Sequence, residues 1–557
     1  MGATVNRVWS RFDGVAMAFP IMLAVVMTYA VGARGPFQET VYFEIALGRE
    51  GGSGWLYPYD NARLLMMLPY KLATMISAGS YWPFQFIQFL LLALVGVLVT
   101  AFVALAWNLS PRVAAVAGSV AVVFGGDMSG AYSGMVIVRQ TMVFWLGALV
   151  LLALASRLRW WIALLAIPLE LAASFTYDPV LIALAVSPLL ILATRRIPRV
   201  ALAVWYLPLV GAIAWQVWRY AIEATTSYQS QQLTAESFGA IAGRLGRLLA
   251  TALFPVAWPG QWSGMIDATD TSAHLALVGW GLAAIALSIG CATLLPGHAP
   301  SMARRPGRLW LAIFSLLLAC IGPYLMIRAP FVLFPGPGGP WRSLLLAAVP
   351  VALAAGLFAE ALSRHRAWQA AVVAMLFACG VTAGVAAQLQ DKARWDDYRS
   401  VFSSIKRLVP SIRSGTLVVL VGLPPTAECP RCVSTPPGGT SPFTSSIWFN
   451  SGLQLAYPGT VVVGTYRDHA GRWAPDMTVV MNPSGIRIPY TNVGVAATNF
   501  TPRQVLVIDW NDGHPHVEMG RQAAWSFALS TRAISTNCPV SVDTPLLGSL
   551  EADIGAC

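Results

Sequence analysis

Tyr81 to Trp107 reads YWPFQFIQFLLLALVGVLVTAFVALAW and carries no charged residue over its 27 positions. A helix needs about 20 consecutive apolar residues to cross the hydrocarbon core of a bilayer, so this stretch predicts a membrane-spanning helix. The whole chain is 56% hydrophobic and 11% charged, which is more apolar than a soluble protein of 557 residues requires. The composition therefore indicates a polytopic membrane protein and argues against a soluble globular one.

Further apolar runs predict about eleven spans in total, each following the same length criterion. The run nearest the N-terminus, Gly14 to Ala33, is predicted to be a retained helix, because no cleavage site for a signal peptide follows it. The other predicted spans are Gly14 to Ala33, Val113 to Gly126, Met135 to Ala155, Trp160 to Phe175, Pro179 to Ala193, Val200 to Ile222, His274 to Leu295, Leu309 to Ile327, Ser343 to Leu362 and Ala367 to Gln388.

Arginines predict the orientation, because short cytoplasmic loops collect Lys and Arg. Every second connection is basic, and a cytoplasmic N-terminus places all of these connections inside. The inner charges are then Arg7, Arg11, Arg112, Arg157, Arg159, Arg195, Arg196, Arg199, Arg304, Arg305, Arg308, Arg364 and Arg366. Residues 1–388 form the predicted transmembrane domain, with outer loops at 34–80 and 223–272, and the tail lies outside.

Residues 389–557 predict an extracytoplasmic domain of the α/β class, rich in β-structure. Its net charge is +1, from 13 basic and 12 acidic residues, so the overall +11 belongs mostly to the membrane part and does not indicate nucleic acid as a partner. Trp395 to Leu408 predicts a helix near the membrane surface. Short apolar runs between turn residues predict strands at Thr416 to Val421, Thr460 to Val463, Thr478 to Met481 and Val505 to Asp509.

Two patterns in the tail resemble metal sites but have simpler interpretations. Cys429 and Cys432 have redox or zinc spacing, yet no pair of histidines accompanies them, and a disulfide is the better interpretation. Asp509, Asp512, His514 and His516 resemble metal ligands, but Asn511-Asp512-Gly513 between two apolar runs is first of all a hairpin turn.

Most other ionisable residues lie at the outer ends of the spans, where they predict a polar cavity open to the outer leaflet. These residues are Glu39, Glu44, Asp60, Arg63, Lys71, Asp127, Arg139, Asp178, Arg219, Arg328 and Arg342, with Glu170 about two turns below Asp178.

The first outer loop contains the candidate catalytic residue. Glu39 follows the first span closely and can act as a general base on a hydroxyl, although a solvated loop residue is the simpler alternative. Asp60 and Arg63 are candidate substrate ligands or the capped start of a helix. Lys71 follows Leu64 to Leu68 in a segment that also fits an amphipathic interfacial helix.

Arg139 and Arg342 are candidate phosphate ligands, because the guanidinium group offers a fork of donors that matches phosphate oxygens. Snorkelling or pairing with a nearby carboxylate explains them equally well. Asp178, in the sequence SFTYDPVL, is either a catalytic group or the N-cap of the helix after Pro179.

The arrangement resembles the GT-C superfamily of polytopic membrane glycosyltransferases, in particular bacterial members of unassigned specificity. The resemblance rests on the carboxylate-bearing first outer loop, on GSGWLYPY leading into NARLLMMLPYKLA, on the TYDP turn at Thr176 to Pro179 and on the outer tail. It is motif-specific over about 40 residues and otherwise architectural.

The resemblance implies transfer of a sugar from a polyprenyl-phosphate donor to a glycan or lipid acceptor of the cell envelope, at the outer face of a bacterial inner membrane. Glu39 matches the base. No cofactor is certain; a divalent metal is a candidate, although the loop lacks the commoner adjacent pair of carboxylates. The alternative function is a transporter or flippase of lipid-linked glycans, with the outer charges lining the substrate path.

Overall fold

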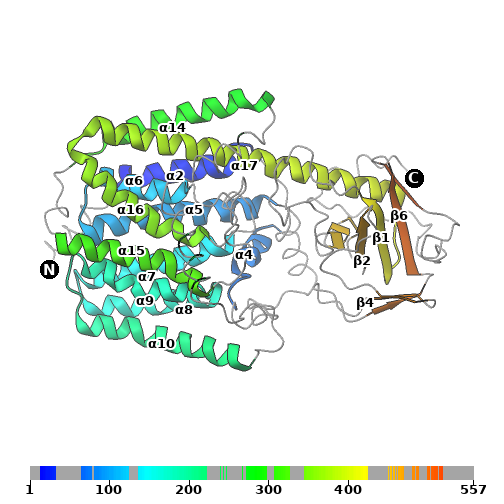
Figure 1. Ribbon diagram of the computed structural model, residues 1–557, viewed down its shortest axis with the longest axis horizontal. Coiled ribbons are helices and arrows are strands. Elements are labelled where there is room, and N and C mark those ends of the chain that lie inside the picture. Colours follow the sequence, from blue (N-terminus) through cyan, green and yellow to red (C-terminus); the bar gives the residue numbers. More distant parts are fainter. Residues whose placement is uncertain are drawn as a thin grey trace. The chain divides into compact units, whose positions relative to one another are not determined.

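The computed structural model describes residues 13–32, 64–77, 81–124, 136–222, 271–297, 306–326 and 344–423, parts of the tail between 449 and 517, and four isolated positions between 239 and 266. These residues form a helical unit and a smaller unit that contains strands (Figure 1). The helical unit contains Gly54–Pro69 and Gln85–Leu389, and the second contains Tyr70–Phe84 and Gln390–Cys557.

Each predicted span has an apolar helix at its position. The helices are α2 (Gly14–Tyr29), α5 (Trp82–Phe102) with the π-helical turn η1 (Val103–Trp107), α6 (Pro111–Val122), α7 (Val136–Ala155), η4 (Trp160–Ala166) with α8 (Ile167–Thr176), α9 (Val180–Leu192), α10 (Arg199–Ile222), η6 (Thr271–Ala273) with α14 (His274–Leu294), α15 (Pro306–Met326), η8 (Leu344–Ala347) with α16 (Ala348–Ala361), η9 (Leu362–Arg364) and α17 (Arg366–Leu408).

Five of the helices in the described ranges are long and apolar enough to cross a bilayer. They are Trp82–Trp107, Val136–Ala155, Arg199–Arg219, Thr271–Leu294 and Arg366–Lys392, whereas six further apolar helices are shorter than 18 residues. The chain is thus an α-helical membrane protein, and the count of about eleven spans stays a prediction.

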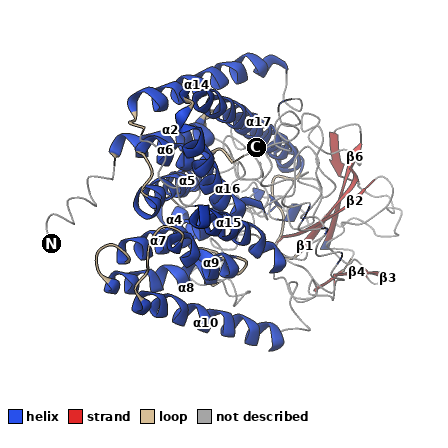
Figure 2. Cartoon of the chain, turned by 60° about the vertical axis from the view of Figure 1, so that its left-hand side comes forward, coloured by secondary structure: helices blue, strands red, loops and turns tan. Residues whose placement is uncertain are grey.

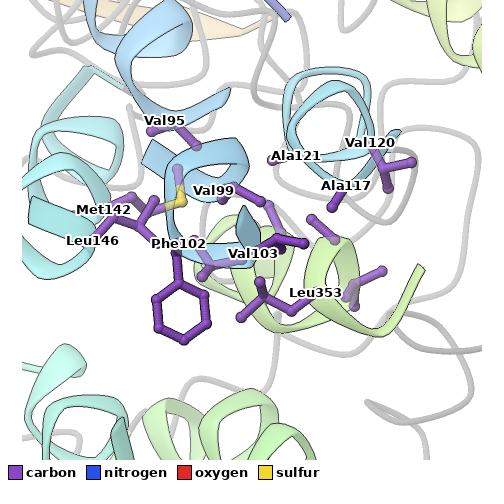
Figure 3. Close-up of a cluster of buried hydrophobic side chains, with 14 of the residues drawn as sticks. Val95, Val99, Phe102, Val103, Ala117, Val120, Ala121, Met142, Leu146 and Leu353 are labelled. Carbon is purple, nitrogen blue, oxygen red and sulfur yellow. The ribbon is translucent and has the colours of Figure 1, made fainter. Parts of the chain in front are cut away.

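Helix α5 lies at the centre of the apolar core. Figure 3 shows Val95, Val99, Phe102 and Val103 of this helix packed against side chains of α6, α7 and α16. These side chains are less than a tenth exposed. The sequence of α5 is apolar on all sides, as a helix surrounded by other helices requires.

Small residues let α5 and α6 approach each other closely. A Cβ atom added at Gly118 would overlap the carbonyl oxygen of Gly96 and the hydroxyl of Thr100. The Thr100 hydroxyl donates a hydrogen bond to the carbonyl of Gly96 at 2.9 Å, so the polar group is satisfied at the crossing. Glycine at both helices permits this contact, which is the usual basis of tight helix packing in membranes.

Helices α10 and α14 lie at opposite margins of the helical unit (Figures 1 and 2). Each exposes a broad apolar face: Leu207 and Val210 on α10, and Leu275 and Leu282 on α14, are all more than half exposed. Lipid is the solvent that such faces require, because water would make this exposure unfavourable.

The described tail contains a mixed sheet and a second, smaller sheet. Strands β1 (Thr416–Leu423), β2 (Val462–Asp468), β6 (Val505–Asn511) and β7 (His514–Val517) lie in the order β2-β1-β6-β7, with β1 parallel to both neighbours. Strands β3 (Val480–Asn482), β4 (Gly485–Ile488) and β5 (Thr498–Phe500) form an antiparallel sheet. The described tail thus contains a small parallel sheet, and its organisation as a separate extracytoplasmic domain stays a prediction.

Apolar side chains join the two sheets. Ile486 and Phe500 of the small sheet cluster with Leu417, Val419 and Val507 of the larger one. The helical residues between β1 and β2 complete a parallel crossover, in which Asn450 accepts a hydrogen bond from the backbone N–H of Gly464 at 3.2 Å.

Two local predictions for the tail are resolved by the structure. Strands β6 and β7 pair antiparallel with Asn511 opposite His514, as the predicted hairpin requires, while Asp512 and Gly513 lie outside the described residues. Trp395 to Leu408 is helical as predicted, but it is the last part of the continuous 43-residue helix α17 rather than a separate helix.

Candidate functional site

Gln140, near the start of α7, connects three segments that are distant in the sequence. Its side chain is 2% exposed. The amide nitrogen donates to the backbone carbonyl of Leu65 at 3.2 Å and to the hydroxyl of Thr176 at 3.3 Å. Thr176 in turn donates to the carbonyl of Ala172 at 2.7 Å, which fixes the hydroxyl at the end of α8. A single amide therefore holds the first outer loop against the α7–α8 pair.

A backbone hydrogen bond strengthens this junction. The N–H of Leu65 donates to the carbonyl of Phe175 at 3.0 Å. Carbonyls in the last turn of a helix have no partner within the helix, so the loop segment satisfies one of them at the end of α8. Met66 and Met67, which follow Leu65, are buried. The segment before α4 (Leu68–Ile76) is thus anchored by both backbone and side-chain contacts.

Two predicted site residues flank the junction. Arg139 precedes Gln140 on α7 and is 4% exposed, and Asp178 is 5% exposed in the turn that follows Thr176. The burial of Arg139 excludes snorkelling, which requires a solvated head group. Helix α9 begins at Val180, with Pro179 in the N-cap position and no side-chain hydrogen bond from that residue. Arg139 and Asp178 each have interaction partners in the structure, and their role as ligands stays a prediction.

We call this side of the helical unit the glutamine end, defined by Gln85, Gln140 and Gln388. Gln85 donates to the carbonyls of Thr28 and Gly32 at the end of α2, at 2.9 Å each. Gln388 on α17 donates to the carbonyl of Val26 at 3.1 Å. Neutral amides thus join α5 and α17 to α2, and α7 to α8, at this end.

The opposite side, the arginine end, is defined by Arg112, Arg157, Arg195 and Arg308. Arg112 donates through Nε and Nη2 to the carbonyl of Leu295 at 3.1 and 2.7 Å. Arg195 donates to the carbonyl of Ala106 at 3.3 Å, and Arg157 to that of Leu105.

Arg308 completes this end by donating to the carbonyl of Thr194 at 3.1 Å. The acceptors lie at helix C-termini, where free carbonyls and the helix dipole favour a cation. The structure therefore gathers four of the predicted inner arginines at one end of the bundle, as alternation of the spans requires. Their cytoplasmic location remains a prediction.

Five other residues were predicted for the site. Lys71 is half-buried on α4 and belongs to the second unit. Glu39, Asp60, Arg63 and Arg342 lie outside the described residues. The candidate site that the described residues form consists of Arg139, Gln140, Thr176 and Asp178 with the loop segment at Leu65.

Sequence reasoning missed Gln140. A neutral amide in an apolar run carries no charge and gave no signal by itself. Its position directly after Arg139 and one helix away from the TYDP turn was the available signal, because α7 and α8 are antiparallel neighbours joined by a short connection.

The described residues contain no group of three or more His, Cys, Asp or Glu side chains that could hold a metal ion. Cys291, Cys320 and Cys379 of the helical unit are free thiols. Cys429, Cys432, Cys538 and Cys557 lie outside the described residues, and so do the loop carboxylates on which a divalent metal would depend.

No family model, no curated protein and no solved structure matches this chain.

Proposed function

We propose that the chain is a membrane glycosyltransferase that transfers a sugar from a polyprenyl-phosphate donor to a glycan or lipid acceptor of the cell envelope. The observation that carries the proposal is the junction at Gln140. It brings together two of the sequence segments that contribute to the resemblance to GT-C enzymes, NARLLMMLPYKLA and the TYDP turn. These segments are separated by about 110 residues, so their contact is a property of the fold rather than of the sequence.

Arg139 and Asp178 give this junction its proposed chemistry. A guanidinium group buried at the end of a helical bundle suits a phosphate whose lipid chain lies in the membrane, because a charge-assisted bidentate contact is strong in a water-poor site. Asp178 lies on the turn beside the same junction, where a carboxylate can accept a hydrogen bond from a hydroxyl of the sugar.

The proposed reaction is a single displacement with inversion. Glu39 takes the proton from the acceptor hydroxyl, and the acceptor oxygen forms a bond to the anomeric carbon of the sugar. The bond from that carbon to the phosphate oxygen breaks, and its electron pair leaves with the polyprenyl phosphate. Arg139 or Arg342 stabilises the negative charge on the departing phosphate.

Purified full-length protein incubated with a panel of polyprenyl-phosphate sugars and envelope glycans tests the proposal. The wild-type protein consumes one donor in the presence of acceptor, and Glu39→Gln does not. Glu44→Gln, a substitution in the same loop, is the matched control and retains transfer. Transfer by Glu39→Gln at the wild-type rate would eliminate Glu39 as the base, and absence of transfer for every donor would count against the function.

A second candidate function is transport of a lipid-linked glycan, and Glu170 favours it. This carboxylate is 1% exposed in the first turn of α8, within the predicted span Trp160 to Phe175, and transporters place ionisable groups at depth in their spans. Single cysteines placed along α7 and α8 distinguish the functions. Labelling from only one membrane face supports the transferase, and labelling from both faces supports transport.

A further inference from the structure

Glu170 is a buried carboxyl group in the first turn of α8. It is 1% exposed, and neither carboxyl oxygen has a partner among the described residues. Its neighbours on the buried stripe of η4 and α8 are small: Ala166, Ala173 and Ser174. The Ser174 hydroxyl donates to the backbone carbonyl of Glu170 at 2.8 Å, so it does not satisfy the side chain.

Contacts between α7 and α8 fix the level of Glu170 in the bundle. Gln140 bonds to Thr176 at one level, and a Cβ atom added to Gly147 would lie 3.0 Å from Leu169 at another. Glu170 therefore lies opposite the middle of α7, six residues or about 9 Å inward from Thr176.

Two polar groups at a similar level are already satisfied by each other. The Trp145 indole N–H donates to the Ser187 hydroxyl at 2.7 Å, and that hydroxyl donates to the carbonyl of Ala183. Neither has a donor left for Glu170, because an indole carries one N–H and a hydroxyl one O–H. Among the described residues, neither of these two groups therefore offers a donor that would stabilise a negative charge on Glu170.

Charged groups on the helices that pack against α8 lie at the helix ends. Among the described residues these are Arg139 on α7, Arg157 after it, Arg159 before η4, Asp178 before α9, Arg195 and Arg196 after it, and Arg199 and Arg219 on α10. Tyr177 follows the last residue of α8, and the hydroxyl of Tyr206 on α10 donates to the carbonyl of Ala185. No cation among the described residues therefore lies level with Glu170 along the bundle.

We propose that Glu170 is a proton-binding site inside the helical unit, which rests as a neutral carboxylic acid and exchanges its proton through the glutamine end. A buried carboxylate without a partner is strongly unfavourable, and protonation removes the charge. Gln140 is a second, independent observation, because its amide oxygen also has no partner among the described residues. Gln140 and Glu170 are thus two open acceptors along one helix pair. This inference is independent of glycosyl transfer.

Labelling with dicyclohexylcarbodiimide tests the proton site. This apolar reagent enters membranes and adds to protonated carboxyl groups. In full-length protein in liposomes, mass spectrometry should find the adduct at Glu170, with none at that position in Glu170→Gln. Glu360 on α16 is the matched control, since it is also buried but has a partner, and it should be labelled several times less. Equal labelling of the two, or no adduct at Glu170, would overturn the proposal.

Infrared spectroscopy tests the same claim without a reagent and locates the route. The wild-type protein should show a carboxylic C=O band that Glu170→Gln lacks, and the band should shift when D₂O replaces H₂O. Gln140→Leu should slow that shift severalfold, while the band itself remains. A band that is absent from the wild type contradicts the proton site, and an unchanged exchange rate in Gln140→Leu contradicts the route.

Discussion

The two ends of the helical unit satisfy free backbone carbonyls with different kinds of side chain. At the arginine end, cations from Arg112, Arg195 and Arg308 saturate carbonyls at helix C-termini. At the glutamine end, neutral amides make the equivalent bonds, and the buried charged residues Arg139 and Asp178 lie beside them. The arginine end uses its charges for structure. The glutamine end makes its structural contacts with uncharged groups, and the proposed function assigns the charges beside them to a ligand.

The largest expected effect is a difference in turnover between arginine variants at the two ends. Arg139→Ala should lower the turnover of a polyprenyl-phosphate donor by about 100-fold or more, because removing a charged donor from a developing anion costs this order of rate. Arg308→Ala, at the arginine end, should leave turnover within about twofold, since its contact is exposed and structural. Similar losses in both variants would mean that the two ends do not differ in function.

The second effect concerns stability at the arginine end. Arg112→Ala removes two hydrogen bonds to the carbonyl of Leu295 and should lower the free energy of unfolding by about 2 kcal/mol. Thermal unfolding in detergent measures the loss, and turnover per folded molecule should be unchanged. A fall in turnover with no fall in melting temperature would contradict the structural role of this arginine.

A smaller effect tests the junction at Gln140. Gln140→Leu removes the bonds to Leu65 and Thr176, which should cost about 1 to 2 kcal/mol and release the loop segment. Hydrogen exchange should rise at Leu65, whose N–H bonds to Phe175, and stay constant at Leu295. Gln85→Leu is the control at the same end; protection of Leu65 should survive in it.

The smallest effect lies in the tail. The Tyr457 hydroxyl donates to the carbonyl of Val409 at 2.6 Å, and burial raises the pKa of this phenol above its ordinary value of about 10. Only the unfolded state then releases the proton near pH 10, so tail stability is constant below this pH and falls as the pH rises further.

Melting of the full-length protein between pH 8 and about 11 measures this loss. Tyr457→Phe should melt lower at pH 8 by the equivalent of about 1 kcal/mol, since it lacks the hydrogen bond, and should lose less stability at alkaline pH. An identical alkaline loss in the variant would assign it to another group.

Hydropathy and charge predicted much of the helical unit. Each predicted span contains an apolar helix, because burial in lipid selects the same residues that a length criterion detects. The basic connections predicted which helix ends lie together, as the contacts of Arg112 and Arg195 show. The strand at Thr416 and the pairing of β6 with β7 were also predicted, from short apolar runs between turn residues.

The site was less predictable, since it depends on contacts between distant segments. Leu65 and Phe175 meet through backbone atoms, which no side-chain pattern reveals. Gln140 is uncharged, and the burial of Arg139 depends on how α7 packs. The continuity of α17 was missed because charged residues after Leu389 end the apolar run but do not end a helix.

The most direct test of the proposed role of the glutamine end is equilibrium binding of a polyprenyl-phosphate sugar to the full-length protein in nanodiscs. Glu39→Gln should bind the donor with wild-type affinity but not consume it, whereas Arg139→Ala should bind at least about tenfold more weakly, equivalent to the loss of one charge-assisted contact. Arg308→Ala should bind as the wild type does. Unchanged affinity in Arg139→Ala, together with weakened affinity in Arg308→Ala, would contradict a ligand site at the glutamine end.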